Sequence, residues 1–370
     1  MASSLMSRGF RTFQVFTKNT KIVRTCPLLK NVRCVRLYTN QSSKRFHQAS
    51  HPTKKAAMIG IFGAAGVAML SNEKKDIKAE ILELIERGKS FNIIGDNRSN
   101  RIFESAKDEA KKALRRGKIS EEERDILVVI ASKLLGEHFL ANGYIDKAEE
   151  CFMEALESYK KLGFDKYDDP SLELILRLTN CFALNGREVE AKESFDMIID
   201  TQLRKIKDSE TTCPLSTYQI LWATLQLYGR FLILNKDYDE AERLFYIADD
   251  VMQKASGEMF SGRQDILTDL AGVKIVKQDL AGAEATFEKA IKIGEKGNSP
   301  ELCLTYCYMA DLATRMGNLD KAEKMCTNGL RLAEKLKDST CLNKANLYIG
   351  KLQEARTNKT KSMTQEDKSD

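Results

Sequence analysis

The first 72 residues contain no aspartate or glutamate, although they contain twelve lysines and arginines. All 53 acidic residues of the chain lie from Glu73 onward. A basic, acid-free segment with scattered apolar residues is typical of a mitochondrial transit peptide. From Glu73 onward there are 47 basic and 53 acidic residues, a net charge of −6. The basic character of the whole chain therefore belongs to the leader and does not indicate a nucleic-acid partner.

The end of this leader is predicted from the tripeptide Arg36-Leu37-Tyr38. An arginine three residues before the cut resembles the pattern of the matrix processing peptidase. We therefore expect residues 1–38 to be the transit peptide, with cleavage between Tyr38 and Thr39, followed by a basic linker at 39–55. Arg36 could instead be one more targeting charge, with the cut elsewhere.

A single apolar run follows the linker, at residues 56–71, between two lysine pairs. Its fifteen uncharged residues from Ala56 make about 22 Å of helix, less than the ~30 Å of a bilayer core. Lysines that snorkel outward bring it close to spanning length. We predict a transmembrane segment in the inner membrane, with a peripheral or cleaved segment as the alternative. Denser positive charge before the run favours a body in the intermembrane space.

Proline is scarce in the body, where only Pro170, Pro214 and Pro300 occur. Long stretches have apolar residues spaced three or four positions apart, which predicts an almost entirely helical body. Loops between helices are expected around Pro170 and Pro214. Asp146, Asp239 and Asp320 are expected as helix N-caps.

Five segments of the body align without gaps on one alanine. Four residues later each has a phenylalanine, or a cysteine in the fifth segment, and twelve residues earlier each has a small residue. This spacing places small and large side chains on one helix stripe and lets a partner helix approach closely. The predicted repeat-packing residues are Gly136, Ala148, Phe152, Ala191, Phe195, Gly229, Ala241, Phe245, Ala283, Phe287 and Ala322.

This pattern resembles the tetratricopeptide repeat family, whose paired antiparallel helices stack into an all-α superhelix, or α-solenoid. The alanines are 43, 50, 42 and 39 residues apart, against a family period of about 34. Five elongated repeats are therefore expected at 119–337. Two N-terminal helices of a degenerate repeat are expected at 73–118, a capping helix at 338–356 and a disordered tail at 357–370.

Histidine is nearly absent from the body, where His138 stands alone and is expected on a helix surface. No phosphate loop, dinucleotide motif or Ser/His/Asp set is present, so we predict no catalytic site, cofactor, metal or small-molecule substrate. The body cysteines lack Cys-x-x-Cys spacing and are expected to be mostly buried thiols rather than zinc ligands. Trp222 is expected in the core.

In this family, first-helix residues on the concave side contact partners. The resemblance therefore implies a groove lined by Lys133, Glu137, Leu176, Asn180, Gln226, Arg230, Thr268 and Asp311. Glu137 beside Lys133, together with the net charge of −6, disfavours a clamp for a peptide carboxylate. An uncharged or basic partner surface is expected instead.

The leader, the span and the repeats together resemble mitochondrial inner-membrane members of the family. That resemblance implies a non-enzymatic scaffold with two kinds of partner, inner-membrane lipid and respiratory complex III including its Rieske protein. It also implies support of complex assembly and clearance of Rieske iron–sulfur fragments, with no nucleic-acid partner. An adaptor of the chaperone or import-receptor type is the alternative, which would call for a clamp cluster. An enzyme would require a catalytic constellation that the sequence lacks.

Overall fold

The computed structural model describes residues 77–93, 98–209, 213–256, 262–299, 301–336 and 338–366. These residues form helices and no strand, which confirms the predicted all-α class for this part of the chain. None of the described helices combines the length and apolar character that crossing a membrane requires. The predicted transit peptide, cleavage point, basic linker and transmembrane segment all lie outside the described residues.

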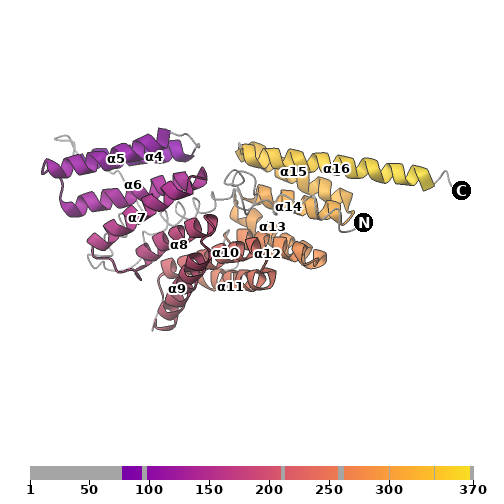
Figure 1. The fold of residues 1–370 in the computed structure, drawn as a ribbon. Helices are drawn as coiled ribbons and strands as arrows, with labels where there is room; N and C mark the ends of the chain where they lie inside the picture. Colours follow the sequence, from indigo (N-terminus) through magenta and orange to yellow (C-terminus); the bar gives the residue numbers. More distant parts are fainter. Residues whose placement is uncertain are drawn as a thin grey trace. The chain divides into compact units, whose positions relative to one another are not determined.

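The helices group into two compact units, one ending at Asp196 and the other beginning at Met197 (Figure 1). The first unit contains α4 (Ile77–Ile93), α5 (Arg98–Arg115), α6 (Glu121–Ala141), α7 (Ile145–Lys161), α8 (Asp169–Leu184) and the first half of α9 (Glu188–Lys207). The second contains the rest of α9, α10 (Leu215–Leu234), α11 (Tyr238–Ser256), α12 (Arg263–Val276), α13 (Leu280–Gly297), α14 (Leu302–Arg315), α15 (Leu319–Leu336) and α16 (Ser339–Glu366).

Each repeat is a helix hairpin, with α6, α8, α10, α12 and α14 as first helices and the helix after each as the second. Within the hairpins α6–α7, α10–α11, α12–α13 and α14–α15 the two helices pack extensively. The second helices bury one stripe of small and large side chains, because residues four and then three positions apart share a helix face. Fully or almost fully buried on this stripe are Ala148, Phe152, Ala191, Phe195, Ala241, Phe245, Ala283, Phe287, Ala322 and Cys326.

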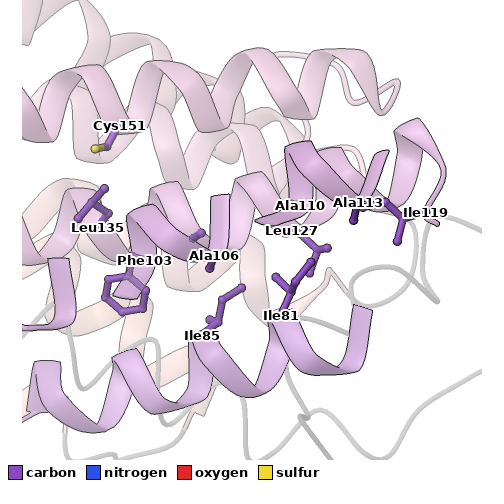
Figure 2. Close-up of a cluster of buried hydrophobic side chains, with 11 residues drawn as sticks. Ile81, Ile85, Phe103, Ala106, Ala110, Ala113, Ile119, Leu127, Leu135 and Cys151 are labelled. Atoms are coloured by element: carbon purple, nitrogen blue, oxygen red, sulfur yellow. The ribbon is translucent and has the colours of Figure 1, made fainter. Parts of the chain in front are cut away.

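The N-terminal pair α4–α5 repeats this packing. Phe103 of α5 is fully buried, and a Cβ added to Gly88 of α4 would lie 2.6 Å from its ring. Figure 2 shows the core of this pair, in which Ile81 and Ile85 reach from α4 toward the helix that carries Phe103. Ser99, four residues before Phe103, takes the place that alanine has in the other repeats. The two helices of the degenerate N-terminal pair therefore pack against each other as the two helices of a full repeat do.

The helices begin at different caps from those predicted. Asp146, Asp239 and Asp320 lie inside the first turns of α7, α11 and α15, and are not N-caps. Asp146 instead accepts a hydrogen bond from Asn185 of the next repeat, at 3.0 Å. The backbone N–H groups of α11 and α15 are capped by the residues just before each helix, Asp237 and Asn318. A carboxylate in the first turn still interacts favourably with the helix dipole.

The C-terminal helix α16 is longer than the predicted capping helix. It runs from Ser339 to Glu366, so most of the stretch predicted as a disordered tail continues the helix. The physical reason is that no proline or glycine interrupts the sequence after Gly350. A disulfide joins Cys303 of α14 to Cys341 of α16, so these two cysteines are exceptions to the expectation that the body cysteines are mostly buried thiols.

Candidate partner-binding surface

In the first unit, charged side chains join the first helices α6 and α8. Arg177 donates hydrogen bonds to Oε1 of Glu137 from Nε at 3.0 Å and from Nη2 at 2.6 Å. Lys133 donates to both carboxylate oxygens of Glu173, at 2.8 and 2.9 Å. Arg177 also lies 3.1 Å from Glu173 and so connects the two pairs. We call these four residues the first-unit seam.

The seam is electrically balanced, with two cations facing two carboxylates. Burial alone would raise the pKa of Glu173, but the charges of Lys133 and Arg177 lower it to about 2. Burial would likewise lower the pKa of Arg177, yet its carboxylate neighbours raise it above the usual value. Glu173 and Arg177 therefore stay charged at neutral pH, and each charged side chain of the seam has an oppositely charged partner inside it.

In the second unit, Asp269 of α12 accepts hydrogen bonds from two residues of α10. Gln226 Nε2 and Arg230 Nε each donate to its Oδ2 at 2.8 Å. Between α12 and α14 the contacts are uncharged: Gln264 donates to Thr305, and the hydroxyls of Thr268 and Thr305 lie 3.0 Å apart. Asp311 of α14 pairs with Lys351 of α16 at 3.2 Å.

The structure thus places the eight predicted groove residues along lines of contact between neighbouring first helices. Five of them bond to a neighbouring first helix in the same unit, and Asp311 bonds to Lys351 of α16, as described above. Leu176 is buried, and Asn180 is half-buried on the α8 face that carries Arg177. The side chains that bond to them were not among the predicted residues; they are Glu173, Arg177, Asp269, Thr305 and Lys351.

A second row of ion pairs runs along the second helices. In four repeats the residue after the aligned alanine is a glutamate that pairs with a cation of the following helix hairpin or of α16. The pairs are Glu149–Arg187 at 2.8 Å, Glu242–Lys277 at 2.6 Å, Glu284–Lys321 at 2.6 Å and Glu323–Arg356 at 2.7 Å. The second repeat has Lys192 at this position. Such partly exposed pairs contribute little stability each, so they chiefly specify which surfaces meet.

An open groove of about 550 Å³ lies between α13, α14 and α15 of the second unit. Its apolar lining comes from Ile291, Met309 and Met325. Lysines and carboxylates in equal number complete the lining: Glu288, Lys292, Glu295, Asp320, Lys321 and Lys324. The groove offers apolar contact but no excess of one charge.

His138 is buried at 1% exposure, which corrects the prediction of a surface histidine. Its Nδ1 lies 3.0 Å from Ser99 Oγ, and its Nε2 lies 3.1 Å from Asn142 Nδ2. Ser99 occupies the position that alanine has in the other repeats, and its hydroxyl makes the hydrogen bond to the His138 ring. Among the residues that the structure describes, His138 is the single histidine. The contacts make it a structural residue that ties α5 to α6.

Trp222 is fully buried in α10, as predicted. Cys151, Cys181, Cys307 and Cys326 are buried free thiols. Cys303, Asp338 and Cys341 bring three possible metal-ligand atoms within 4.8 Å of one another, but the two sulfurs are joined in the disulfide. Asp338 is also occupied, because it accepts a hydrogen bond from the backbone N–H of Cys341 at 3.2 Å.

Comparison with known proteins supports the resemblance seen in the repeats. No family model matches the chain. "Tetratricopeptide repeat protein 19, mitochondrial" of Rattus norvegicus is 22% identical over 310 residues, which cover 82% of this chain and 83% of that protein. The protein of the same name in Homo sapiens is 22% identical over 75% of this chain and 72% of its own length.

Among solved structures, the Rap protein complexed with Competence and Sporulation Factor superposes with a TM-score of 0.54. The match covers 86% of this chain and 79% of that one, at 12% identity, so it concerns the fold alone. The relatives found in curated sequences are mitochondrial and share one name. The predicted resemblance is therefore confirmed: over most of its length the chain is similar to the mitochondrial tetratricopeptide repeat protein 19.

Proposed function

We propose that this chain is a non-enzymatic scaffold of the mitochondrial inner membrane. It binds respiratory complex III and supports the assembly or maintenance of that complex, including clearance of Rieske iron–sulfur fragments. The observation that carries the proposal is the similarity over 82% of the chain to a mitochondrial tetratricopeptide repeat protein. The apolar run at 56–71 is the proposed anchor in the lipid, with the body in the intermembrane space.

The proposed contact surface is the face of the first helices. In the first unit, Lys133 and Arg177 are already neutralised by Glu173 and Glu137. A peptide carboxylate would have to displace one of these carboxylates and leave it unpaired, at a large energetic cost. This disfavours a chaperone-type clamp and favours a partner that offers uncharged surface, including amide and backbone groups, to residues such as Asn180.

Affinity capture from gently solubilised mitochondria tests the proposal. We expect a tagged full-length chain to retain complex III subunits, including the Rieske protein. Capture of Hsp70 or translocase subunits in their place would support the adaptor alternative and contradict the scaffold. In a null mutant we expect lower complex III activity and accumulated Rieske fragments. Normal activity without fragments would refute the assignment to complex III.

Two matched variants of the second repeat locate the contact. Asn180→Arg places a charge on the half-buried first-helix face, whereas Lys192→Glu changes an exposed residue of the second helix. We expect Asn180→Arg to reduce capture of complex III about tenfold, as loss of one central contact does, and Lys192→Glu to leave it unchanged. If Ile291→Glu abolishes capture while Asn180→Arg does not, the partner binds in the α13–α15 groove, and the proposal that it contacts the first helices is wrong.

A further inference from the structure

The fifth repeat is packed by smaller side chains than the four repeats before it. Cys326 stands in α15 where the other repeats have a phenylalanine, and Gly329 follows it. A Cβ added to Gly329 would lie 3.3 Å from both the carbonyl oxygen of Cys303 and the Sγ of Cys307. The second helix therefore lies close against α14 without the phenylalanine that the other repeats bury at this position, and the second helix of this repeat contributes less apolar surface to the core.

The N-terminal half of α16 docks on α14 and α15, whereas its C-terminal half has little core contact. Its buried residues are Cys341, Ala345 and Leu352, with Leu342 packed beside them, and the described side chains after Leu352 are half-buried or exposed. Lys351 pairs with Asp311 at 3.2 Å, and Arg356 pairs with Glu323 at 2.7 Å. Both cations are more than two-fifths exposed, so these pairs contribute little to docking.

The disulfide connects the first turns of α14 and α16. Cys303 and Cys341 lie 38 positions apart in sequence, with Cα atoms 6.3 Å apart and both side chains at most 1% exposed. The loop that the bond closes contains all of α15. Closing such a loop removes many conformations in which α16 is detached. The bond is thus the strongest single link between α16 and the rest of the second unit.

We propose that Cys303 and Cys341 form a thiol–disulfide switch that locks α16 onto α14 when oxidised and lets it detach when reduced. Because both sulfurs are buried in the docked state, exchange with a soluble thiol or disulfide requires α16 to lift first. Oxidation therefore traps the docked helix, and burial slows reduction to the rate at which local opening of the first turn of α16 exposes the bond. The switch acts whatever partner the scaffold binds, so it does not rest on the function proposed above.

Glutathione disulfide can serve as the oxidant. The thiolate of one cysteine attacks the glutathione disulfide and forms a mixed disulfide, and one glutathione leaves as the thiolate. The second cysteine, as its thiolate, attacks the protein sulfur of the mixed disulfide and releases the other glutathione. In total the two cysteines lose two protons and two electrons, and one glutathione disulfide becomes two glutathione thiols.

Neighbouring cysteines compete poorly for this exchange. Cys307 lies one helical turn after Cys303, and burial raises the pKa of its thiol to about 12. Burial also raises the pKa of the Cys326 thiol. Both remain protonated near neutral pH and are weak nucleophiles, because the thiolate is the reactive form.

Detachment of α16 would change the surface that a partner meets. Tyr308 would lose its hydrogen bond from Lys344, which is 2.8 Å long, and Asp311 would lose Lys351. The outer face of α14 would then be open to solvent. The redox state of the two sulfurs would thus decide whether α16 covers this face of α14, the last of the first helices.

The test uses the full-length chain in detergent, equilibrated with either glutathione disulfide or dithiothreitol. Iodoacetamide labelling and intact mass count the free thiols, while limited trypsin digestion reports cleavage within α16 at Lys344, Lys351 and Arg356. We expect the oxidised chain to show two fewer labelled cysteines and about tenfold slower cleavage in α16, because docked segments resist proteolysis.

Variants and a metal control complete the test. Under both conditions, Cys303→Ser and Cys341→Ser should be cleaved as fast as the wild-type chain treated with dithiothreitol. The control Cys213→Ser should keep the difference between the oxidised and reduced states. Equal cleavage of the oxidised and reduced wild-type chain would overturn the proposal without relying on any variant. So would labelling in which zinc chloride alone protects Cys303 and Cys341 and glutathione disulfide does not, since that marks a metal site shared with Asp338.

Discussion

Gly136 of α6 lies so close to Phe152 of α7 that a Cβ added to the glycine would come within 2.6 Å of ring atom Cε1. Gly229 and Phe245 have the same relationship in the third repeat, at 2.7 Å. Both rings are fully buried, at 0% exposure. A close-packed interior leaves such a ring no free space to move into. The missing Cβ therefore sets how near the two helices of these repeats approach.

Replacing either glycine by alanine should destabilise the fold. Overpacking a core usually costs about 1–3 kcal/mol, and contacts as close as these lie toward the upper end. Because alanine favours a helix interior over glycine by ~1 kcal/mol, we expect Gly136→Ala and Gly229→Ala each to lower the free energy of unfolding by about 1–2 kcal/mol. Urea denaturation of the purified body, followed by circular dichroism at 222 nm, measures the change.

Gly272 supplies the matched control for these variants. It lies within α12, next to the buried Ala271, and a Cβ there would meet no heavy atom within 4 Å. Gly272→Ala should therefore stabilise the fold by about 0.5–1 kcal/mol. Destabilisation of the same size at all three glycines would show that helix contact is not the cause.

The stripe of alanine and phenylalanine was accessible to sequence analysis because it depends on spacing within one helix. That spacing is fixed by 3.6 residues per turn and needs no knowledge of distant parts. The equivalence of α4–α5 was only partly visible, since Ser99 replaces the alanine on which the other segments align. The same serine explains the error at His138, whose buried ring bonds to it.

The contacts between repeats could not be predicted because the repeats differ in length. Lys133 and Glu173 are 40 positions apart, as are Glu137 and Arg177, while Arg230 and Asp269 are 39 apart. Opposite charges about one repeat apart in the sequence could have indicated such pairs. However, the aligned alanines are 39 to 50 positions apart, so the sequence separation between two paired residues could not be fixed in advance. The Cys303–Cys341 pair, 38 apart, was missed for the same reason.

The turn between the two helices of each repeat contains one residue with a left-handed backbone. It lies five positions before the aligned alanine and is Gly143, Gly186 or Gly317 in three repeats. In the other two it is Lys236, with φ of 65°, and Gln278, with φ of 67°. A side chain costs roughly 1 kcal/mol in this conformation. We expect Lys236→Gly and Gln278→Gly each to raise the free energy of unfolding by about 0.5–1 kcal/mol.

The reverse change at an equivalent glycine checks this prediction. Gly186→Ala should destabilise the fold by about 1 kcal/mol. No heavy atom lies within 4 Å of the added Cβ, so only backbone strain can act. Thermal unfolding of the three variants beside the wild-type protein would measure these shifts. A lower melting temperature for both Lys236→Gly and Gln278→Gly would contradict the prediction.

The seam between α6 and α8 should weaken in acid. Lys133 and Arg177 lower the pKa of Glu173 to about 2, below the value of 4.5 that an unperturbed glutamate has. A lowered folded-state pKa gives stability that is fully present above pH 4.5 and is lost as the pH falls toward 2. Because the Glu173 side chain is one-third exposed, solvent screening reduces this contribution to about 1 kcal/mol.

Glu173→Gln isolates this acid-dependent term. At pH 7 the variant should be less stable than the wild type by about 1 kcal/mol, and the difference should shrink as the pH approaches 2. Urea titrations at pH 7, 4.5 and 2.5 measure it. Glu157→Gln, which alters a carboxylate 58% exposed and 4.0 Å from Lys161, should change stability by less than about 0.5 kcal/mol. A constant difference for Glu173→Gln across this range would show that its ionisation does not stabilise the seam.

A buried ion pair joins three helices of the second unit at Arg263. This first residue of α12 is 2% exposed and donates to Asp249 of α11 from Nε at 2.6 Å and from Nη2 at 3.0 Å. Lys289 of α13 donates to the same carboxylate at 3.0 Å. Burial would raise the pKa of Asp249, but the two cations lower it below its usual value. Asp249 therefore stays ionised, with the buried Arg263 as its main partner and the half-exposed Lys289 as a second.

Removing Arg263 should cost far more than removing Lys289. Arg263→Met leaves Asp249 buried with one partner, which is expected to cost about 3–5 kcal/mol. Arg263→Lys keeps the charge but loses the two-pronged geometry, so an intermediate loss is expected. Lys289→Met removes a side chain that is 52% exposed and should cost less than about 1 kcal/mol. Chemical denaturation at pH 7 ranks the three variants, and a loss for Arg263→Met no larger than that for Lys289→Met would refute a structural role for the buried pair.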